Sequence, residues 1–149
     1  MDQKNFRQPA VMTIMLAEDV ASFRRTLREL IELRPELLVV CESADGKEAV
    51  QRARQFQPDF VILDLNLPKL SGFDVARRLG SVSPNSNIIF LSMELSADIV
   101  DEAFRLGAKA YVYKGEFFEL LAAIDAIRQG YGFVSKSLSR KHIAPRIND

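Results

Sequence analysis

Hydrophobic and polar positions along this chain follow two alternating patterns. Short continuous apolar runs are separated by longer segments in which apolar residues recur every three or four positions. The short runs predict buried strands of a parallel sheet, and the longer segments predict amphipathic helices. The predicted strands are 11–17, 37–41, 60–63, 87–92 and 110–113, and the predicted helices are 20–31, 47–56, 71–79, 99–106 and 117–127.

Strand and helix alternate five times, which predicts an α/β fold with a doubly wound, five-stranded parallel sheet covered by helices on both faces. The chain has 149 residues, enough for one domain with a sizeable core, which we place at 11–130. Residues 1–10 lack periodicity and are expected to form a loose lead-in. Residues 131–149 contain basic side chains among few apolar ones and are expected to form an exposed tail.

Polar residues stand where the predicted strands end. Asp64 follows the apolar run 60–63, and Pro68 stops the segment soon afterwards. The other four strand-end residues are Glu18, Asp19, Ser92 and Lys114. In open α/β sheets ligands bind at the carboxyl ends of the strands, and with strand order 2-1-3-4-5 the three carboxylates converge there. The sequence therefore predicts one acidic site at this edge.

Each of these residues also has a purely structural interpretation. Asp commonly forms turns after strands, an acidic pair suits a helix N-terminus, and a lysine suits the surface. Five of them at one edge favour a site instead. Unpaired carboxylates raise one another's pKa values, and a divalent cation relieves that repulsion. Because the ligands are oxygens, we expect Mg²⁺, with Mn²⁺ as a possible substitute.

The predicted chemistry is phosphoryl transfer to a carboxylate. Asp64 is the expected nucleophile and would form an aspartyl phosphate. The ammonium group of Lys114 can pair with Asp64 and then with a phosphoryl oxygen. The hydroxyl of Ser92 can donate to another phosphoryl oxygen. The metal would offset charge on the transferred group.

With these residues in place, the chain resembles the receiver domain of two-component response regulators over about residues 11–130. The family motifs match Glu18-Asp19, Asp64 in Leu63-Asp64-Leu65-Asn66-Leu67-Pro68, Gly72, Ser92 and Lys114. The resemblance implies a flavodoxin-like (CheY-like) sheet of order 2-1-3-4-5. It also implies that Asp19, Asp64 and the backbone carbonyl of Asn66 ligate the metal, with Glu18 acting largely through water.

The resemblance assigns regulatory roles to further residues. Tyr111 matches the switch aromatic, which turns inward when Ser92 moves onto the phosphoryl group and reshapes the surface of the fourth helix, fifth strand and fifth helix; a core tyrosine is the alternative. Asn66 and Glu94 occupy positions that tune the lifetime of the phosphate. Met93 is bulky where the family usually has Ala or Gly, which predicts narrower access to Asp64.

The C-terminal part resembles receivers of the NarL/FixJ type, in its Lys114-Gly115 pair and its 130–133 run. Such receivers usually continue into a LuxR-type helix-turn-helix, for which residues 131–149 are too few. The chain is therefore expected to be a receiver-only protein or one whose output domain was lost or left out. The implied partners are a histidine kinase or phosphotransfer protein, and an output protein or missing DNA-binding domain; a homodimer remains open.

Composition narrows the remaining classes. The 20 basic and 20 acidic residues cancel, which argues against direct binding of nucleic acid or anionic membrane. The apolar run 10–17 is too short to span a bilayer. Cys41 is the single cysteine, which suits a reducing interior, and we expect a cytoplasmic protein. The single histidine, His142, is expected to be a solvated side chain.

Three functions are weighed on this basis. The first is a phosphorylation switch, which is a signalling domain rather than a turnover enzyme. The second is a small phosphohydrolase with Asp64 as nucleophile, but Asn66 occupies the position where that chemistry needs a general acid. The third is a phosphate-independent interaction domain on the same fold. The complete set of site residues favours the first.

Overall fold

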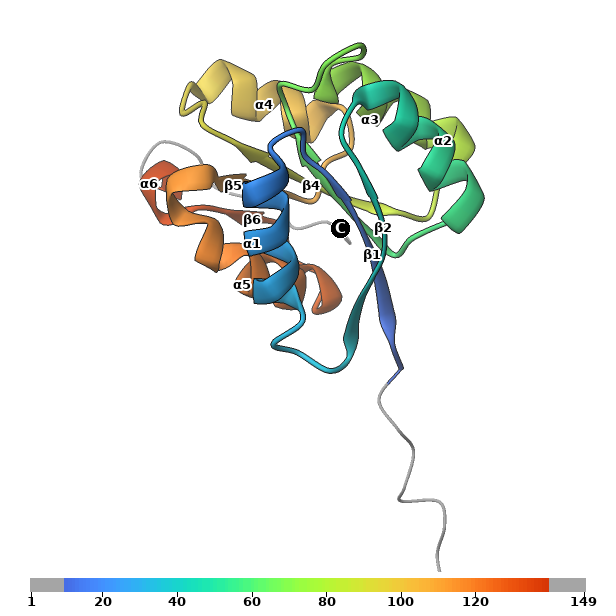
Figure 1. Cartoon of the computed structure of the whole chain (residues 1–149). Coiled ribbons are helices and arrows are strands. Elements are labelled where there is room, and N and C mark those ends of the chain that lie inside the picture. The colour runs from blue at the N-terminus through green and yellow to red at the C-terminus, as the bar shows by residue number, and fades with distance from the viewer. Residues whose placement is uncertain (1–9, 140–149) are drawn as a thin grey trace, which may run out of the picture.

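A parallel sheet forms the centre of the protein (Figure 1). The structure is a computed structural model that describes residues 10–139. Within these residues the sheet has six strands in the order β2-β1-β3-β4-β5-β6. The strands are β1 (Met12–Ala17), β2 (Leu37–Ser43), β3 (Phe60–Asp64), β4 (Asn87–Ser92), β5 (Ala110–Tyr113) and β6 (Phe133–Val134). The predicted α/β class and the order 2-1-3-4-5 are confirmed.

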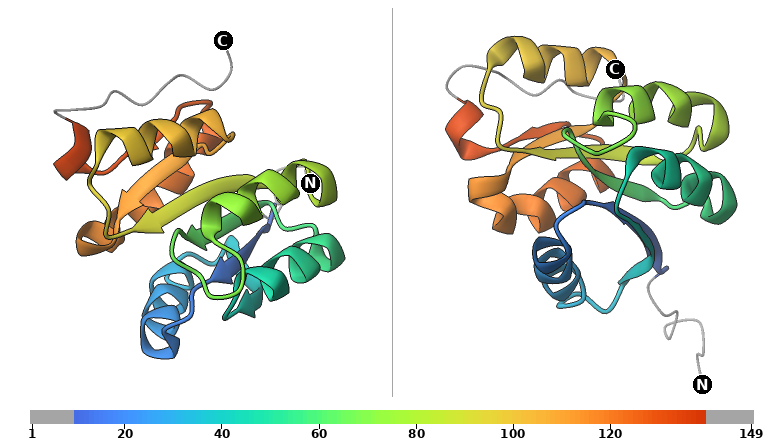
Figure 2. Two further views of the ribbon diagram at one scale, coloured as in Figure 1. Left: turned by 90° about the horizontal axis from the view of Figure 1, so that it is seen from above. Right: turned by 45° about the horizontal axis from the view of Figure 1, so that its top comes forward.

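Helices cover both faces of the sheet (Figures 1 and 2). α1 (Ala21–Ile31) and α5 (Leu120–Arg128) pack on one face through a core cluster that includes Leu27 and Ile124. The other face is covered by α2 (Gly46–Phe56), α3 (Gly72–Val82) and α4 (Ala97–Arg105), through a second cluster. The amphipathic pattern of each helix is the physical reason for this two-layer cover.

The position of β3 in the middle of the sheet explains why its sequence is continuously apolar. Val61 and Leu63 belong to the cluster under α2, α3 and α4, whereas Phe60 and Ile62 belong to the cluster under α1 and α5. All five residues of the strand are buried, including the terminal Asp64. A strand with helices on both faces has no solvent side, so polar alternation is absent.

The C-terminal segment differs from the prediction. We expected five strands and an exposed tail from residue 131, but β6 pairs with β5 as a sixth parallel strand. A short helix α6 (Lys136–Ser139) follows, and the side chains of Ser135 and Leu138 are buried. The prediction of an exposed tail is therefore wrong for the segment 132–135 and for Leu138, which are buried or partly buried, whereas Tyr131, Lys136, Ser137 and Ser139 are exposed. The remaining tail with His142, and the lead-in 1–9, lie outside the described residues.

The connection from β5 to α5 also differs from the prediction. A 3₁₀ helix, η2 (Lys114–Glu119), precedes α5, and the backbone at Glu116 departs from helical geometry inside it. Phe117, which we assigned to the start of the last helix, therefore belongs to η2. The result is a compact turn that begins at Lys114, the last predicted site residue.

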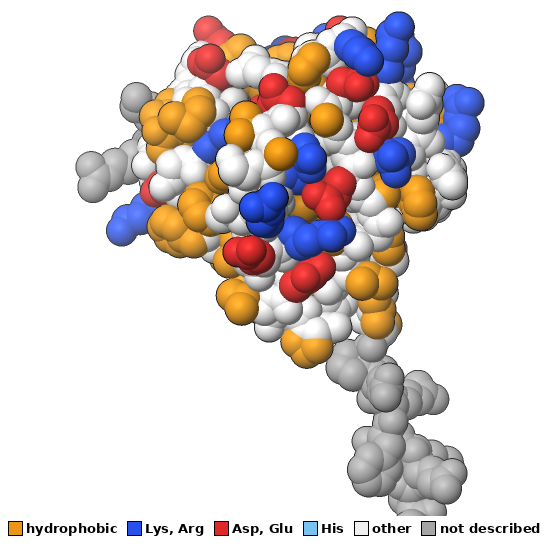
Figure 3. Space-filling view, viewed as in Figure 1, with side chains coloured by type: hydrophobic (Ala, Val, Ile, Leu, Met, Phe, Trp, Pro, Cys, Tyr) orange, Lys and Arg blue, Asp and Glu red, His pale blue; other side chains and the backbone are white. Residues whose placement is uncertain are grey.

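The surface matches the balanced charge of the sequence. Basic and acidic side chains intermingle on the face that carries α1, with apolar side chains between them (Figure 3). Among residues 10–139, none of the helices combines the length and hydrophobicity needed to cross a membrane.

Candidate functional site

Asp64 ends β3 at the carboxyl edge of the sheet and is only 3% exposed. The backbone N–H of Asn66 donates to Asp64 Oδ1 at 3.1 Å. The chain then returns to the site at Gly72, whose N–H donates to the carbonyl of Leu65 at 2.8 Å. A Cβ at position 72 would lie 2.4 Å from the Asp64 carbonyl oxygen, so this close approach requires glycine.

Glu18 and Asp19 face Asp64 from the loop that follows β1. Carboxylate oxygens of the three residues all lie within 4.8 Å of one another. Glu18 is 2% exposed, whereas Asp19 is exposed. The predicted convergence of the acidic residues is therefore confirmed. It follows from the adjacency of β1 and β3 in the sheet.

Lys114 supplies the positive charge at this edge. Its Nζ lies 3.2 Å from Asp64 Oδ2 and 3.2 Å from both carboxylate oxygens of Glu18. The same Nζ lies 5.4 Å from the ring centroid of Phe23, within the range of a cation–π contact. One ammonium group thus contacts two of the three carboxylates.

The buried pair of carboxylates is electrostatically strained. The pKa of Glu18 is raised from 4.5 to about 7, first by burial and then by the neighbouring Asp64, while Lys114 opposes the rise. Three carboxylates against one ammonium leave excess negative charge in a poorly solvated place. The donor atoms are hard oxygens, so the residues present fit Mg²⁺ or Mn²⁺.

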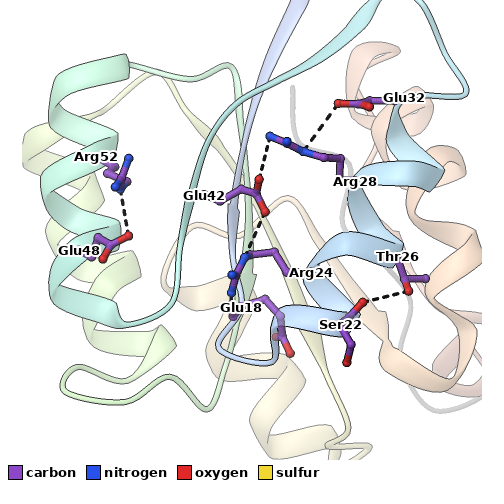
Figure 4. A network of polar contacts seen from close by, with 9 residues as sticks. All are labelled: Glu18, Ser22, Arg24, Thr26, Arg28, Glu32, Glu42, Glu48 and Arg52. Atoms are coloured by element: carbon purple, nitrogen blue, oxygen red, sulfur yellow. Dashed lines mark hydrogen bonds and ion pairs between the residues drawn. The ribbon is translucent and has the colours of Figure 1, made fainter.

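Arg24, in α1, also contacts the site, although it is not among the residues predicted from the sequence. Its guanidinium donates to the backbone carbonyl of Glu18 at 2.6 Å and to Glu42 Oε1 at 3.1 Å (Figure 4). Arg28 joins the network through Glu42 at 2.8 Å. The arginine therefore ties the acidic loop to β2 and holds Glu18 in place.

Ser92, Glu94 and Tyr111 form a hydrogen-bonded chain. The Glu94 backbone N–H donates to Ser92 Oγ at 3.0 Å, and the Tyr111 hydroxyl donates to the Glu94 carbonyl at 2.9 Å. Ser92 and Tyr111 are both 0% exposed, and burial raises the pKa of the tyrosine. Tyr111 thus points inward in this structure and is connected to Ser92 through the backbone of Glu94.

The site opens to the surface through a mostly apolar depression of about 290 Å³. It is lined by Glu18, Val20, Phe23, Met93, Lys114 and Gly115. Met93 is 59% exposed, so it stands at the mouth rather than filling it.

Comparisons with known proteins agree with this geometry. Residues 14–125 match the family described as the response regulator receiver domain. The chain belongs to this family. Individual relatives and solved structures of receiver domains resemble this chain as well.

Two curated relatives and one solved structure illustrate the similarity. The chain is 30% identical over 134 residues to the nitrate/nitrite response regulator protein NarL of Escherichia coli K12. This match covers 89% of this chain and 61% of NarL. The chain is 26% identical over 131 residues to the transcriptional regulatory protein DegU of Brevibacillus brevis, covering 87% of this chain and 56% of DegU. This receiver therefore spans 61% or less of these relatives.

The crystal structure of a LuxR-family two-component response regulator from Aurantimonas sp. SI85-9A1 superimposes with a TM-score of 0.83 at 34% identity. The match covers 89% of this receiver and 95% of that chain. The flavodoxin-like, CheY-like fold expected from the sequence is thereby shown.

The structure brings most of the predicted receiver residues together. The carboxylates of Glu18, Asp19 and Asp64 cluster together. Lys114 contacts Glu18 and Asp64, and Ser92 lies at the end of β4 next to β3. Asn66 is exposed and reaches the site through its backbone. Arg24 was missed, because helical spacing alone does not reveal that a long side chain turns back to a loop.

Proposed function

We propose that this receiver accepts a phosphoryl group on Asp64 from a histidine kinase or a phosphotransfer protein. The modification then regulates a partner or an output domain. The observation that carries the proposal is the position of Lys114 Nζ, 3.2 Å from Asp64 Oδ2 beside the three clustered carboxylates.

In the proposed step a carboxylate oxygen of Asp64 attacks the phosphorus of a phosphohistidine. A P–O bond forms, the P–N bond breaks, and the imidazole leaves with the electron pair of that bond. The Asn66 N–H bond to Oδ1 and the Lys114 contact to Oδ2 hold the carboxylate in place during the attack. The product is an aspartyl phosphate.

Asp19, Asp64 and the Asn66 carbonyl would hold Mg²⁺, or Mn²⁺ in its place, with Glu18 acting through water. The metal would supply positive charge that offsets the transferred group. Lys114 would pair with one phosphoryl oxygen and Ser92 would donate its hydroxyl proton to another. In this proposal the domain is a switch and not a turnover enzyme, since the aspartyl phosphate is its signal.

The proposed output is a change at α4, β5 and α5 that passes through Ser92 and Tyr111. The hydrogen bonds that join Ser92 to the Glu94 backbone, and Glu94 to Tyr111, support this route. Asn66, Met93 and Glu94 are proposed to tune the lifetime of the phosphate, as the resemblance to the receiver family implies for these positions.

The test is phosphorylation of the full chain with acetyl phosphate or a phosphohistidine donor and Mg²⁺, read by intact mass. We expect one added phosphoryl group, and none in Asp64→Asn. Asp59→Asn, at the other end of β3, is the matched control and should be modified like the wild type. Undiminished phosphorylation of Asp64→Asn would contradict the proposal. Binding of BeF₃⁻ with no turnover of phosphate esters would exclude the phosphohydrolase and the phosphate-independent domain.

A further inference from the structure

The segment Phe133–Ser139 contacts the end of β5 on both sides of Val112. The Ser135 N–H donates to the carbonyl of Tyr111 at 3.1 Å, and the Tyr113 N–H donates to Ser135 Oγ at 2.7 Å. The Ser135 side chain is 0% exposed. This one buried serine therefore holds the strand on both sides of Val112, directly before Lys114.

A second set of contacts joins the same segment to η2. The Ser137 N–H donates to Glu116 Oε1 at 3.1 Å, and the Lys136 N–H donates to Glu119 Oε1 at 3.2 Å. Both glutamates lie in the short turn that starts with Lys114. The loop that carries the lysine is thus attached to the C-terminal segment on its other side as well.

Packing adds a third connection. Leu138 is 1% exposed and belongs to the same core cluster as Tyr111, and Val134 lies opposite Tyr111 in the β5–β6 ladder. The ring of Tyr113 in turn covers Gly115, where a Cβ would lie 2.3 Å from Tyr113 Cε2. The proposed switch tyrosine and the lysine loop therefore share one supporting element.

We propose that Phe133–Ser139 is a clamp that positions Lys114 and Tyr111 for the reaction at Asp64, with Ser135 as its positioning residue. The inference rests on the proposed function, and it assigns a role in regulating the site to a segment expected to be an exposed tail. The chain beyond residue 139 continues directly from this clamp.

The direction of the coupling follows from the docked geometry. With the clamp in place, Lys114 lies within 3.2 Å of Asp64 and Tyr111 points inward. This is the arrangement that would bind a phosphoryl group, so docking favours phosphorylation. Because binding couplings are reciprocal, a phosphoryl group on Asp64 must tighten the clamp by the same factor.

The test measures Mg²⁺-dependent binding of BeF₃⁻ to the full chain. Ser135→Ala removes the acceptor for the Tyr113 N–H and should weaken BeF₃⁻ binding at least about fivefold, the lower end of typical coupling. The matched control is Ser83→Ala. Ser83 is also buried, at 2% exposed, and its Oγ lies 2.7 Å from Ser86 Oγ beyond the C-terminus of α3, away from the site.

A second measurement detects the reciprocal effect. In the wild type, Mg²⁺ with BeF₃⁻ should slow amide hydrogen exchange at Ser135 and Ser137, whereas Mg²⁺ alone should have little effect. If Ser135→Ala fails to fold, the double variant Glu116→Ala with Glu119→Ala replaces it and should weaken BeF₃⁻ binding in the same direction.

The outcomes separate the clamp from the proposed function. Equal BeF₃⁻ affinities for Ser135→Ala and Ser83→Ala, or unchanged exchange at both amides, would overturn the clamp while Asp64 remains the phosphorylation site. Wild-type protein that binds no BeF₃⁻ in an Asp64-dependent way would overturn both. A selective loss in Ser135→Ala with increased protection in the wild type would support the clamp.

Discussion

Polar residues at the two ends of the sheet lie in opposite electrostatic environments. At the amino end, Asp59 Oδ2 accepts from the Thr13 N–H at 2.8 Å and from the Thr13 hydroxyl at 3.1 Å. The Asp59 N–H donates back to Thr13 Oγ1 at 3.0 Å. At the carboxyl end, oxygens of three carboxylates lie within 4.8 Å of one another, and the ammonium group of Lys114 contacts two of them.

This difference separates the end of the sheet that stabilises the fold from the end that carries the candidate site. The amino end is a closed set of hydrogen bonds in which a single carboxylate is satisfied by neutral donors, so its residues hold strands together. The carboxyl end keeps excess negative charge in a buried place, which lowers stability and creates affinity for cations. Changes at the two ends should therefore have opposite signs.

The largest expected effect is the change in the free energy of unfolding with pH that Glu18 causes in the absence of metal. Because the pKa of Glu18 is raised to about 7, the folded state binds its proton more tightly than the unfolded state. Its contribution, of the order of a few kcal/mol, is fully present below the unfolded pKa near 4.5 and is lost as the pH rises through 7. Urea unfolding in EDTA across this range measures it.

Glu18→Gln is the control for that titration, since the amide keeps the shape but does not ionise. The variant should show a flatter profile between pH 4.5 and 7. A wild-type profile that rises over this range in EDTA would contradict the raised pKa.

The next prediction compares the stability of variants at Asp59, just before β3, and at Asp64, the last residue of β3. Asp59→Ala should lower the free energy of unfolding by about 1–3 kcal/mol, because it leaves the Thr13 N–H and hydroxyl without their acceptor. Asp64→Asn should raise the free energy of unfolding in EDTA, because it removes one of three repelling carboxylates. Denaturant unfolding of both variants at neutral pH checks the signs. Destabilisation of equal size at both positions would remove the distinction between the ends.

Much of this asymmetry can be predicted from the sequence. The apolar run before Asp64 and the alternation of strand and helix are strong signals because each extends over many residues. These two signals are sufficient to place the acidic residues at one edge of the sheet. The boundaries at β2, α3 and η2 moved by a few residues, which local pattern does not determine.

The remainder depends on tertiary contacts that leave no periodic signal. β6 has two residues, too few for a strand pattern, and Leu138 is a single apolar residue in a basic region. Arg24 reaches the Glu18 carbonyl and Glu42 only because the packed fold brings β2 and the loop after β1 next to α1. The burial that raises the pKa of Glu18 is likewise a property of the packed site.

A smaller effect concerns the metal. Asp19→Asn should weaken Mg²⁺ binding by at least about tenfold, equivalent to roughly 1.4 kcal/mol, because it removes one hard anionic ligand. Titration calorimetry in the absence of phosphodonor measures the affinity. Asp59→Asn, at the closed end, should bind Mg²⁺ like the wild type. Equal affinities in Asp19→Asn and the wild type would place the cation elsewhere.

The smallest expected effect is at Ser92, which joins the charged end to the core. Ser92→Ala removes the acceptor of the Glu94 N–H, worth about 0.5–1.5 kcal/mol as a neutral hydrogen bond. Phosphorylation of Asp64 should persist, because the lysine and metal contacts are untouched. The response of Tyr111 should be blunted, because its hydroxyl is held by the carbonyl of that same Glu94.

The readout is the order of the Tyr111 ring, by NMR with Mg²⁺ and with or without BeF₃⁻. Tyr111 already points inward here, so the expected change in the wild type is a narrower distribution about this position rather than a large swing. A ligand shifts such an equilibrium only by its differential affinity for the two states. Identical narrowing in Ser92→Ala would break the proposed connection. A wild-type ring that does not respond to BeF₃⁻ at all would show that Tyr111 has only a structural role, as Thr13 and Asp59 have at the closed end of the sheet.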